Sequence, residues 1–256
     1  MADLQTAARQ ALACLDLTSL NDADTAADIE TLCARAQTRF GPVAAVCVWP
    51  RFVAQARTLL PANIRVAAVA NFPQGMLDTA AALADVAAIA QAGADEIDVV
   101  LPYKALMAGQ RSAVAEFLAE VRHASRPLTL KLIIESGELK TPELIQQATR
   151  MGLVAGVDFI KTSTGKTPVS ATPEAAQVML HEIKASGLGN AGFKASGGIR
   201  TVADAQLYLQ LVADALGASA LTPQRFRFGA SGLLNDIEVV LGGTASASAS
   251  AENSSY

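Results

Sequence analysis

The sequence predicts a single (β/α)8 TIM barrel with a short N-terminal helix and a flexible C-terminal tail. Apolar runs of strand length alternate with longer segments of helical period, and eight such units fit into 256 residues without a dividing linker. Hydrophobic residues make up 51% of the chain, which is enough for the core of one large α/β domain. A doubly wound open sheet is the alternative, because periodicity alone does not close a barrel.

The expected strands are short apolar runs bounded by polar or small residues. They occupy residues 13–17, 43–49, 65–71, 96–101, 128–135, 158–162, 191–195 and 226–229. The expected helices occupy residues 22–39, 78–92, 103–123, 142–151, 173–185 and 202–216. Two of these helices begin with proline after Thr141 and Thr172, a pattern typical of an N-cap followed by the first helical residue.

The chain is expected to form one domain followed by a tail. Residues 1–242 form the predicted barrel, and residues 243–256 alternate Ala and Ser before the chain ends in Tyr256. Low-complexity segments of this kind behave as flexible chain.

Charge and cysteine content limit the partners and the compartment. The net charge of −4 argues against a nucleic-acid or anionic-membrane surface. No apolar stretch approaches the roughly 20 residues of a membrane-spanning helix, and the N-terminus has no signal-peptide pattern. The three cysteines form no close pair, which suits free thiols in a reducing environment. The expected location is therefore the cytoplasm.

Lys161 and Lys194 are the most informative residues. Each stands in an apolar run that then breaks into small polar residues, and the two runs fit consecutive strands of a parallel sheet. Burying a charged lysine side chain in a strand costs free energy of folding unless the charge is paired, so an unpaired one indicates a functional role. Burial and a nearby cation both lower the pKa of an amine, and a neutral amine can attack a carbonyl carbon. The pair therefore predicts an enzyme that forms a Schiff base.

Three further ionisable residues lie inside apolar runs: Asp16, Asp98 and Lys131. In a barrel, side chains from these strands can converge on one interior. A single charged residue at a strand edge is more often solvated or part of a structural ion pair, and for Asp16 and Lys131 a role as charge partner alone is the alternative. Glu135 and Glu138 lie near a strand end and a turn, and we expect both to be solvated.

Three turns of small residues follow the last three expected strands, and they predict a phosphate site. Glycine lets backbone N–H groups approach an anion, and barrels often bind phosphate at the loops after strands 7 and 8. The candidate residues are Thr164, Gly165, Lys166, Gly197, Gly198, Ser231 and Gly232. Residues 164–167 also resemble the end of a P-loop, but Ile160 stands where that motif needs glycine, so we reject a nucleotide-hydrolysing function.

With these motifs the chain resembles the deoxyribose-phosphate aldolases, a family of class I aldolases. The similarity runs from Asp16 to Tyr256 and is carried by residues 15–18, 45–52, 71–73, 96–100, 131–135 and the two lysine motifs. The segment 159–165, which contains Lys161, is the most specific of these matches. The resemblance implies reversible cleavage of 2-deoxy-D-ribose 5-phosphate to D-glyceraldehyde 3-phosphate and acetaldehyde, in deoxyribonucleoside catabolism.

The resemblance also implies individual roles. Lys161 forms the Schiff base, Lys194 keeps Lys161 reactive, and Asp98 hydrogen-bonds Lys194 and a water that moves protons. Tyr256 assists proton transfer at the acetaldehyde carbon. Thr18 and Cys47 fall at substrate-pocket positions, although Cys47 is also consistent with a small buried hydrophobic residue. The family comparison suggests a homodimer, and neither a metal nor another cofactor is expected.

The chain departs from the family pattern at two places. Residues 74–76 read Gln-Gly-Met where close relatives often carry His-Gly-Asn, and Gly232 replaces a common second serine. The phosphate site thereby loses one hydroxyl but keeps the backbone N–H of Gly232.

Two other classes of function are weighed against the aldolase. One is a phosphate-binding barrel isomerase or synthase without imine chemistry, and the other is a non-enzymatic sugar-phosphate sensor. The presence of Lys161, Lys194 and Asp98 together favours the aldolase.

Overall fold

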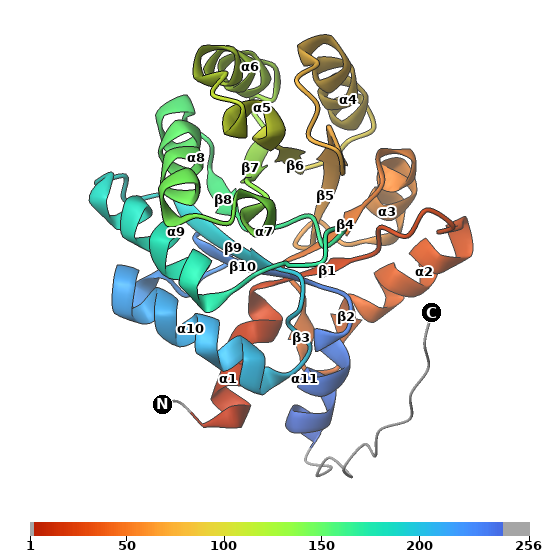
Figure 1. The fold of residues 1–256 in the computed structure, drawn as a ribbon. Helices are drawn as coiled ribbons and strands as arrows, with labels where there is room; N and C mark the ends of the chain where they lie inside the picture. Colours follow the sequence, from red (N-terminus) through yellow and green to blue (C-terminus); the bar gives the residue numbers. More distant parts are fainter. Residues whose placement is uncertain (1–2, 243–256) are drawn as a thin grey trace.

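The computed structural model describes residues 3–242. Eight parallel strands close into a barrel in the order β1-β10-β9-β8-β7-β6-β5-β4, which confirms the predicted fold class and excludes the open sheet (Figure 1). The barrel strands are β1 (Leu15–Thr18), β4 (Ala45–Val48), β5 (Arg65–Ala70), β6 (Glu96–Val100), β7 (Thr129–Ile133), β8 (Phe159–Lys161), β9 (Gly192–Ser196) and β10 (Phe226–Ala230).

Helices surround the barrel, and one long helix follows each barrel strand (Figure 1). These helices are α2 (Ala26–Arg35), α3 (Val53–Leu59), α4 (Thr79–Gln91), α6 (Arg111–Ala124), α8 (Pro142–Ala155), α9 (Pro173–Ala185), α10 (Val202–Leu216) and α11 (Leu233–Gly242). The N-terminal helix α1 (Leu4–Ala13) packs against α10 and α11. No helix in residues 3–242 is long and apolar enough to cross a membrane.

Several short elements lie between the barrel strands and the long helices. They are α5 (Tyr103–Met107), α7 (Ser136–Leu139), the 3-10 helices η1 (Pro50–Phe52) and η2 (Ala218–Ala220), and the small hairpin of β2 (Gln37–Thr38) and β3 (Gly41–Pro42).

The two predicted N-caps are confirmed. Thr141 accepts a hydrogen bond from the backbone N–H of Leu144, and Thr172 accepts one from that of Ala175. Each bond satisfies an N–H group that the first turn of a helix leaves free.

Two predicted helices were wrong in extent. The helix expected at 22–39 is only α2, because Thr25 and Asp28 form a capping box that starts it later. The helix expected at 103–123 is divided into α5 and α6 near Gly109, which has a φ of +81°. Neither α3, which has no side-chain cap, nor α11 was predicted.

The strands alternate between two environments. One set of side chains faces the helices and joins the main hydrophobic core, for example Ile97 and Val99 on β6 and Phe226 and Phe228 on β10. Successive side chains of a strand point to opposite faces, so the intervening residues face the barrel interior. On most strands these interior residues are charged, and they form the site described next.

Candidate active site

Seven ionisable side chains meet inside the barrel, and none is more than 5% exposed. We call this group the interior charge cluster. It consists of Asp16, Glu96, Asp98, Lys131, Lys161, Lys194 and Arg227. The parallel register brings them together, because Asp98 is the partner of Lys131, and Lys194 is the partner of both Lys161 and Arg227.

Asp98 is at the centre of the cluster. Its Oδ2 accepts hydrogen bonds from Lys161 Nζ at 2.8 Å and Lys194 Nζ at 2.8 Å, and its Oδ1 accepts one from Lys131 Nζ at 2.7 Å. Burial alone would raise the pKa of Asp98, but the three ammonium groups hold it well below its usual range. Asp98 is therefore a carboxylate that three lysines share.

Three of the four cations each contact two carboxylates closely. Lys131 Nζ lies 2.5 Å from Glu96 and 2.7 Å from Asp98. Lys194 Nζ lies 2.5 Å from Asp16 and 2.8 Å from Asp98. Arg227 binds Asp16 at 2.5 Å and Glu96 at 2.8 Å.

Lys161 is the exception, because its ammonium group contacts one carboxylate, Asp98, and shares that Oδ2 atom with Lys194. Burial lowers the pKa of Lys161, and although Asp98 opposes this, the Lys194 charge lowers it further. Burial also acts to lower the pKa of Lys194, but Asp16 and Asp98 raise it above its ordinary value. Of these two lysines, Lys161 is therefore the one that loses its proton first.

The balance of charges in the cluster is also consistent with a neutral amine at Lys161. Four cationic groups face three carboxylates in the cluster, so a proton lost from Lys161 makes the numbers equal. Low-dielectric surroundings favour such a balance. The arrangement can supply a neutral, nucleophilic amine at Lys161 next to a permanently charged Lys194.

One side of the interior is apolar. Cys47 on β4 is fully buried with Ala67 and Val69 of β5, and Leu20 completes this small cluster. Burial and the Asp98 carboxylate raise the pKa of Cys47, so its thiol remains protonated at neutral pH. This wall is suited to contact with the small apolar part of a substrate.

A cavity of about 510 Å³ lies at the mouth of the barrel. Thr18 and every predicted phosphate-site residue line it: Thr164, Gly165, Lys166, Gly197, Gly198, Ser231 and Gly232. Gly197 and Gly198 have φ values of +84° and +82°, a region that favours glycine. Arg200, which was not among the predicted site residues, also lines the cavity. It adds a second cation besides Lys166.

The cavity lies directly above the cluster. Thr18 and Ser196 line the cavity, and each follows a cluster residue of the same strand, Asp16 or Lys194, by two positions. Residues two apart in a strand share a face and are separated by about 6.6 Å. A ligand with its phosphate among the glycines could therefore extend downward toward Lys161, which is 2% exposed while Lys194 is 0% exposed.

The structure changes three expectations about site residues. Glu96 and Arg227 belong to the cluster but were not predicted, although Glu96 stands two positions before Asp98 and so shares its face. Glu135 was predicted to be solvated and is fully buried, because it accepts hydrogen bonds from Thr164. Glu138 is half-buried. Tyr256 lies outside the described residues.

Within residues 3–242, no group of three or more His, Cys, Asp or Glu side chains is placed to hold a metal ion.

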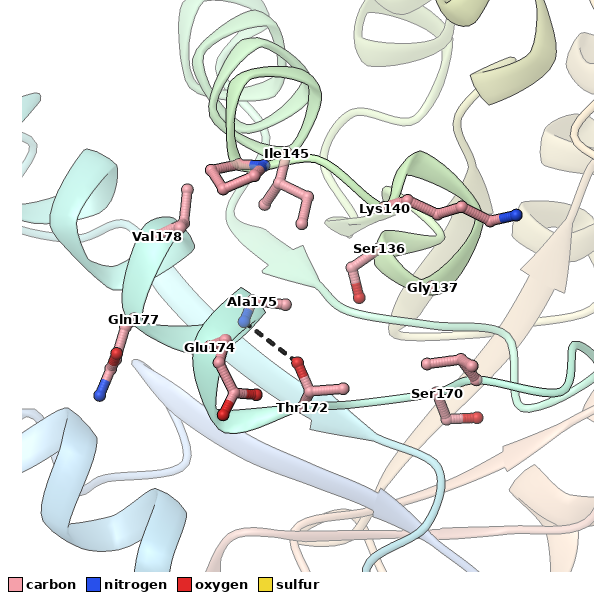
Figure 2. A pocket seen from close by; sticks show the side chains of 12 residues that line it. Ser136, Gly137, Lys140, Ile145, Ser170, Thr172, Glu174, Ala175, Gln177 and Val178 are labelled. Carbon is pink, nitrogen blue, oxygen red and sulfur yellow. Dashed lines mark hydrogen bonds between the residues drawn. The ribbon is translucent and has the colours of Figure 1, made fainter.

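A second cavity, of about 530 Å³, lies between α7, α8 and α9, and no residue of the interior charge cluster lines it (Figure 2). Its lining includes Ser136 and Gly137 of α7 and, across from them, Ser170 and Thr172 of the loop that follows β8. Ile145 and Val178 make much of the remaining lining apolar. This cavity shows how closely the loop after β8 approaches α7.

Comparisons with known proteins identify the relatives of this chain. A family model described as DeoC/LacD family aldolase matches residues 10–238. Over 240 residues the chain is 51% identical to a deoxyribose-phosphate aldolase of Agrobacterium fabrum, and the match covers 93% of this chain and 92% of that protein.

Solved structures give the same fold. A candidate deoxyribose-phosphate aldolase from Coccidioides immitis is 29% identical with a TM-score of 0.79, covering 90% of this chain and 86% of that one. The apo form of a candidate deoxyribose-phosphate aldolase from Toxoplasma gondii is 24% identical with a TM-score of 0.86, covering 95% and 98%. The second likeness bears on the fold alone.

Proposed function

The chain belongs to the DeoC/LacD family of aldolases, and from this membership we propose that it cleaves 2-deoxy-D-ribose 5-phosphate reversibly to D-glyceraldehyde 3-phosphate and acetaldehyde. The reaction proceeds through a Schiff base on Lys161 and serves deoxyribonucleoside catabolism. The identity of 51% to a deoxyribose-phosphate aldolase supports the substrate. The observation that carries the mechanism is that Lys161 has one carboxylate contact whereas each other cation of the cluster has at least two.

The first half of the proposed mechanism uses the low pKa of Lys161. Its neutral amine adds to the C1 aldehyde of the open-chain sugar, and the hydroxyl of the resulting carbinolamine takes up a proton and leaves as water, which gives a protonated imine. The C3 hydroxyl then gives up its proton, and the C2–C3 bond breaks with its electron pair drawn toward the imine. Glyceraldehyde 3-phosphate leaves, and an enamine of acetaldehyde remains on Lys161.

The second half needs a proton at C2 and a water at C1. Lys194 and Asp98, joined at 2.8 Å, are suited to relay protons near the amine. Tyr256 is proposed to assist the transfer to C2. Hydrolysis of the resulting imine releases acetaldehyde and restores the amine.

The phosphate end of the substrate is assigned to the cavity at the barrel mouth. Lys166 and Arg200 supply positive charge there, and the backbone N–H groups around Gly197 and Gly198 supply donors without side-chain bulk. This position fits a substrate anchored at C5 and reacting at C1.

The deciding experiment is borohydride trapping with 2-deoxyribose 5-phosphate, followed by peptide mass mapping. We expect a reduced adduct on Lys161 that is absent in Lys161→Arg and present in Lys184→Arg, a control at an exposed lysine of α9. An adduct on Lys194 would keep the reaction class and reverse the lysine roles. Phosphate binding without any adduct would instead support an isomerase, a synthase or a sensor.

The assembly and location are further parts of the proposal. We propose a homodimer in the cytoplasm, acting on small phosphorylated sugars and aldehydes. Light scattering of the purified chain would give its mass, and a monomer or tetramer would contradict the dimer.

A further inference from the structure

Glu135 is a buried carboxylate in a strained conformation. It follows β7 with a φ of +55°, a left-handed value that is strained for a residue with a Cβ. It is 0% exposed, and no basic side chain in residues 3–242 forms an ion pair with it. Both features oppose folding. Strain and unpaired buried charge of this kind occur where a structure must hold a functional geometry.

The carboxylate of Glu135 binds the loop that follows β8. We call residues 163–172 the β8 loop. The Oε2 atom of Glu135 accepts a hydrogen bond from Thr164 Oγ1 at 2.5 Å. The backbone N–H of Thr164 lies 3.3 Å from both Glu135 oxygens. Thr167 Oγ1 donates to Oε1 at 3.3 Å. Thr164 Oγ1 in turn accepts the backbone N–H of Lys166 at 3.0 Å, so the contacts run from Glu135 to a residue of the cavity.

The backbone on either side of Glu135 holds the strand that carries Lys161. The N–H of Ile134 donates to the Lys161 carbonyl at 3.0 Å, and the N–H of Ser136 donates to the Thr162 carbonyl at 2.9 Å. The left-handed turn at Glu135 thus allows the chain to leave β7 while its side chain points at Thr164.

Close packing fixes the far end of the β8 loop. A methyl group added at Gly137 of α7 would overlap the backbone carbonyl of Val169. On the opposite side, a methyl group at Gly197 would lie 2.5 Å from Ser170 Oγ. The β8 loop is therefore held between α7 and the glycine turn after β9, and Figure 2 shows Ser136 and Gly137 on one side of the cavity and Ser170 on the other.

We propose that Glu135 is a positioning residue that sets substrate affinity through the phosphate group. Its carboxylate gathers donors from Thr164 and Thr167, which orients the β8 loop so that Gly165 and Lys166 face the cavity at the barrel mouth. Glu135 does not itself touch the substrate. This inference rests on the proposed function, since it assigns the cavity to the substrate phosphate.

The test is Glu135→Gln, which keeps the shape of the side chain but places an amide donor among the loop donors. We expect the KM for 2-deoxyribose 5-phosphate to rise by about tenfold or more, as the loss of charge-assisted hydrogen bonds allows. The kcat/KM for 2-deoxyribose should change by less than about twofold. This sugar has no phosphate, so it makes no contact with the β8 loop that the substitution could weaken. Glu138→Gln is the matched control, because it makes the same substitution three residues further along in α7.

Two outcomes would overturn the proposal. One is an equal loss of kcat/KM for the phosphorylated and the unphosphorylated sugar, which would mean a general structural role. The other is an unchanged KM for both. If Glu135→Gln does not fold, Thr167→Val removes one loop donor and should produce a smaller change in the same direction.

A separate measurement keeps this inference distinct from the proposed reaction. Calorimetric titration with inorganic phosphate reports on the cavity without any imine chemistry. Weaker phosphate binding in Glu135→Gln than in the parent would support the role of Glu135 even if the parent formed no borohydride adduct. Equal phosphate affinity in both proteins would contradict it.

Discussion

The interior charge cluster and the cavity above it hold charge in different ways. In the cluster, cations and carboxylates are buried and bind one another directly, as Lys194 binds Asp16 and Asp98. In the cavity, small residues and glycine backbone surround an open volume, with Lys166 and Arg200 in the lining. A reacting amine needs fixed, water-free neighbours that set its pKa, whereas a phosphate must enter and leave. The difference therefore matches the two ends of one substrate.

The same contrast appears between two lysines of the cluster. Lys161 and Lys194 are register partners on β8 and β9, and both are almost completely buried. Their pKa values nevertheless shift in opposite directions, because Lys194 has the additional carboxylate of Asp16. The number of carboxylate contacts, and not burial alone, distinguishes Lys161, the proposed nucleophile, from Lys194.

The largest expected effect is that of Lys161→Arg. Arginine keeps the charge but cannot form the imine, so kcat should fall by about 10⁴-fold. Steady-state cleavage of 2-deoxyribose 5-phosphate measures this, with Lys184→Arg as control. Activity near that of the parent would show that another lysine is the nucleophile.

Asp98→Asn should have the next largest effect. The change removes the carboxylate that Lys131, Lys161 and Lys194 share, so proton transfer and geometry both suffer. We expect kcat to fall by about 10³-fold. We also expect the free energy of unfolding to fall by about 3 kcal/mol, because buried cations lose a partner. Steady-state kinetics tests the fall in kcat, and urea denaturation tests the fall in the free energy of unfolding. An unchanged kcat would mean that Asp98 has a structural role only.

Lys194→Met should lower kcat by less than Asp98→Asn does, through loss of the proposed proton relay, and should also shift the pH dependence. Removal of the Lys194 charge raises the pKa of Lys161. Asp98 Oδ2 is then no longer shared with Lys194 and stabilises the Lys161 ammonium more strongly, which raises the pKa of Lys161 further. At a given pH less of Lys161 is neutral, so the acid limb of the pH–rate profile moves to higher pH. Lys184→Met is the control. An acid limb that stays in place would mean that Lys194 does not set the reactivity of Lys161.

The smallest expected effect concerns the cavity. Gly232 has no atom within 4 Å of the position of an added Cβ, so a serine fits there. Gly232→Ser supplies one more hydroxyl to the phosphate, and KM should fall by about threefold while kcat stays unchanged. Ser231→Ala should raise KM by a similar factor. A change in kcat would indicate that these residues act on the chemistry and not on phosphate binding.

The fold was predictable because its signals are local. Alternating apolar runs predicted the barrel, and Thr141 and Thr172 marked two helix starts. The missed break at Gly109 depends on a single left-handed residue that a periodic pattern does not reveal. Helix α3 lacks a side-chain cap, so its start had no sequence signal.

The candidate site was partly predictable for a different reason. Lys161, Lys194, Asp98, Lys131 and Asp16 interrupt apolar runs, which is visible in the sequence, and the barrel brings them together. Glu96 and Arg227 were missed, and Glu135 was wrongly predicted to be solvated, because the surroundings of these side chains depend on partners far away in the chain. Arg227 pairs with Asp16 across 211 positions, and Glu135 reaches a loop 29 positions later.

The central claim is that Lys161 is the lysine whose amine becomes neutral most readily inside the cluster. Trace acetylation with acetic anhydride over a range of pH, followed by peptide mass mapping, measures this directly for each lysine. We expect Lys161 to react with a midpoint below the ordinary value of 10.5, and Lys194 and Lys131 not to react over that range. Equal reaction of Lys194, or a Lys161 midpoint at or above 10.5, would contradict it.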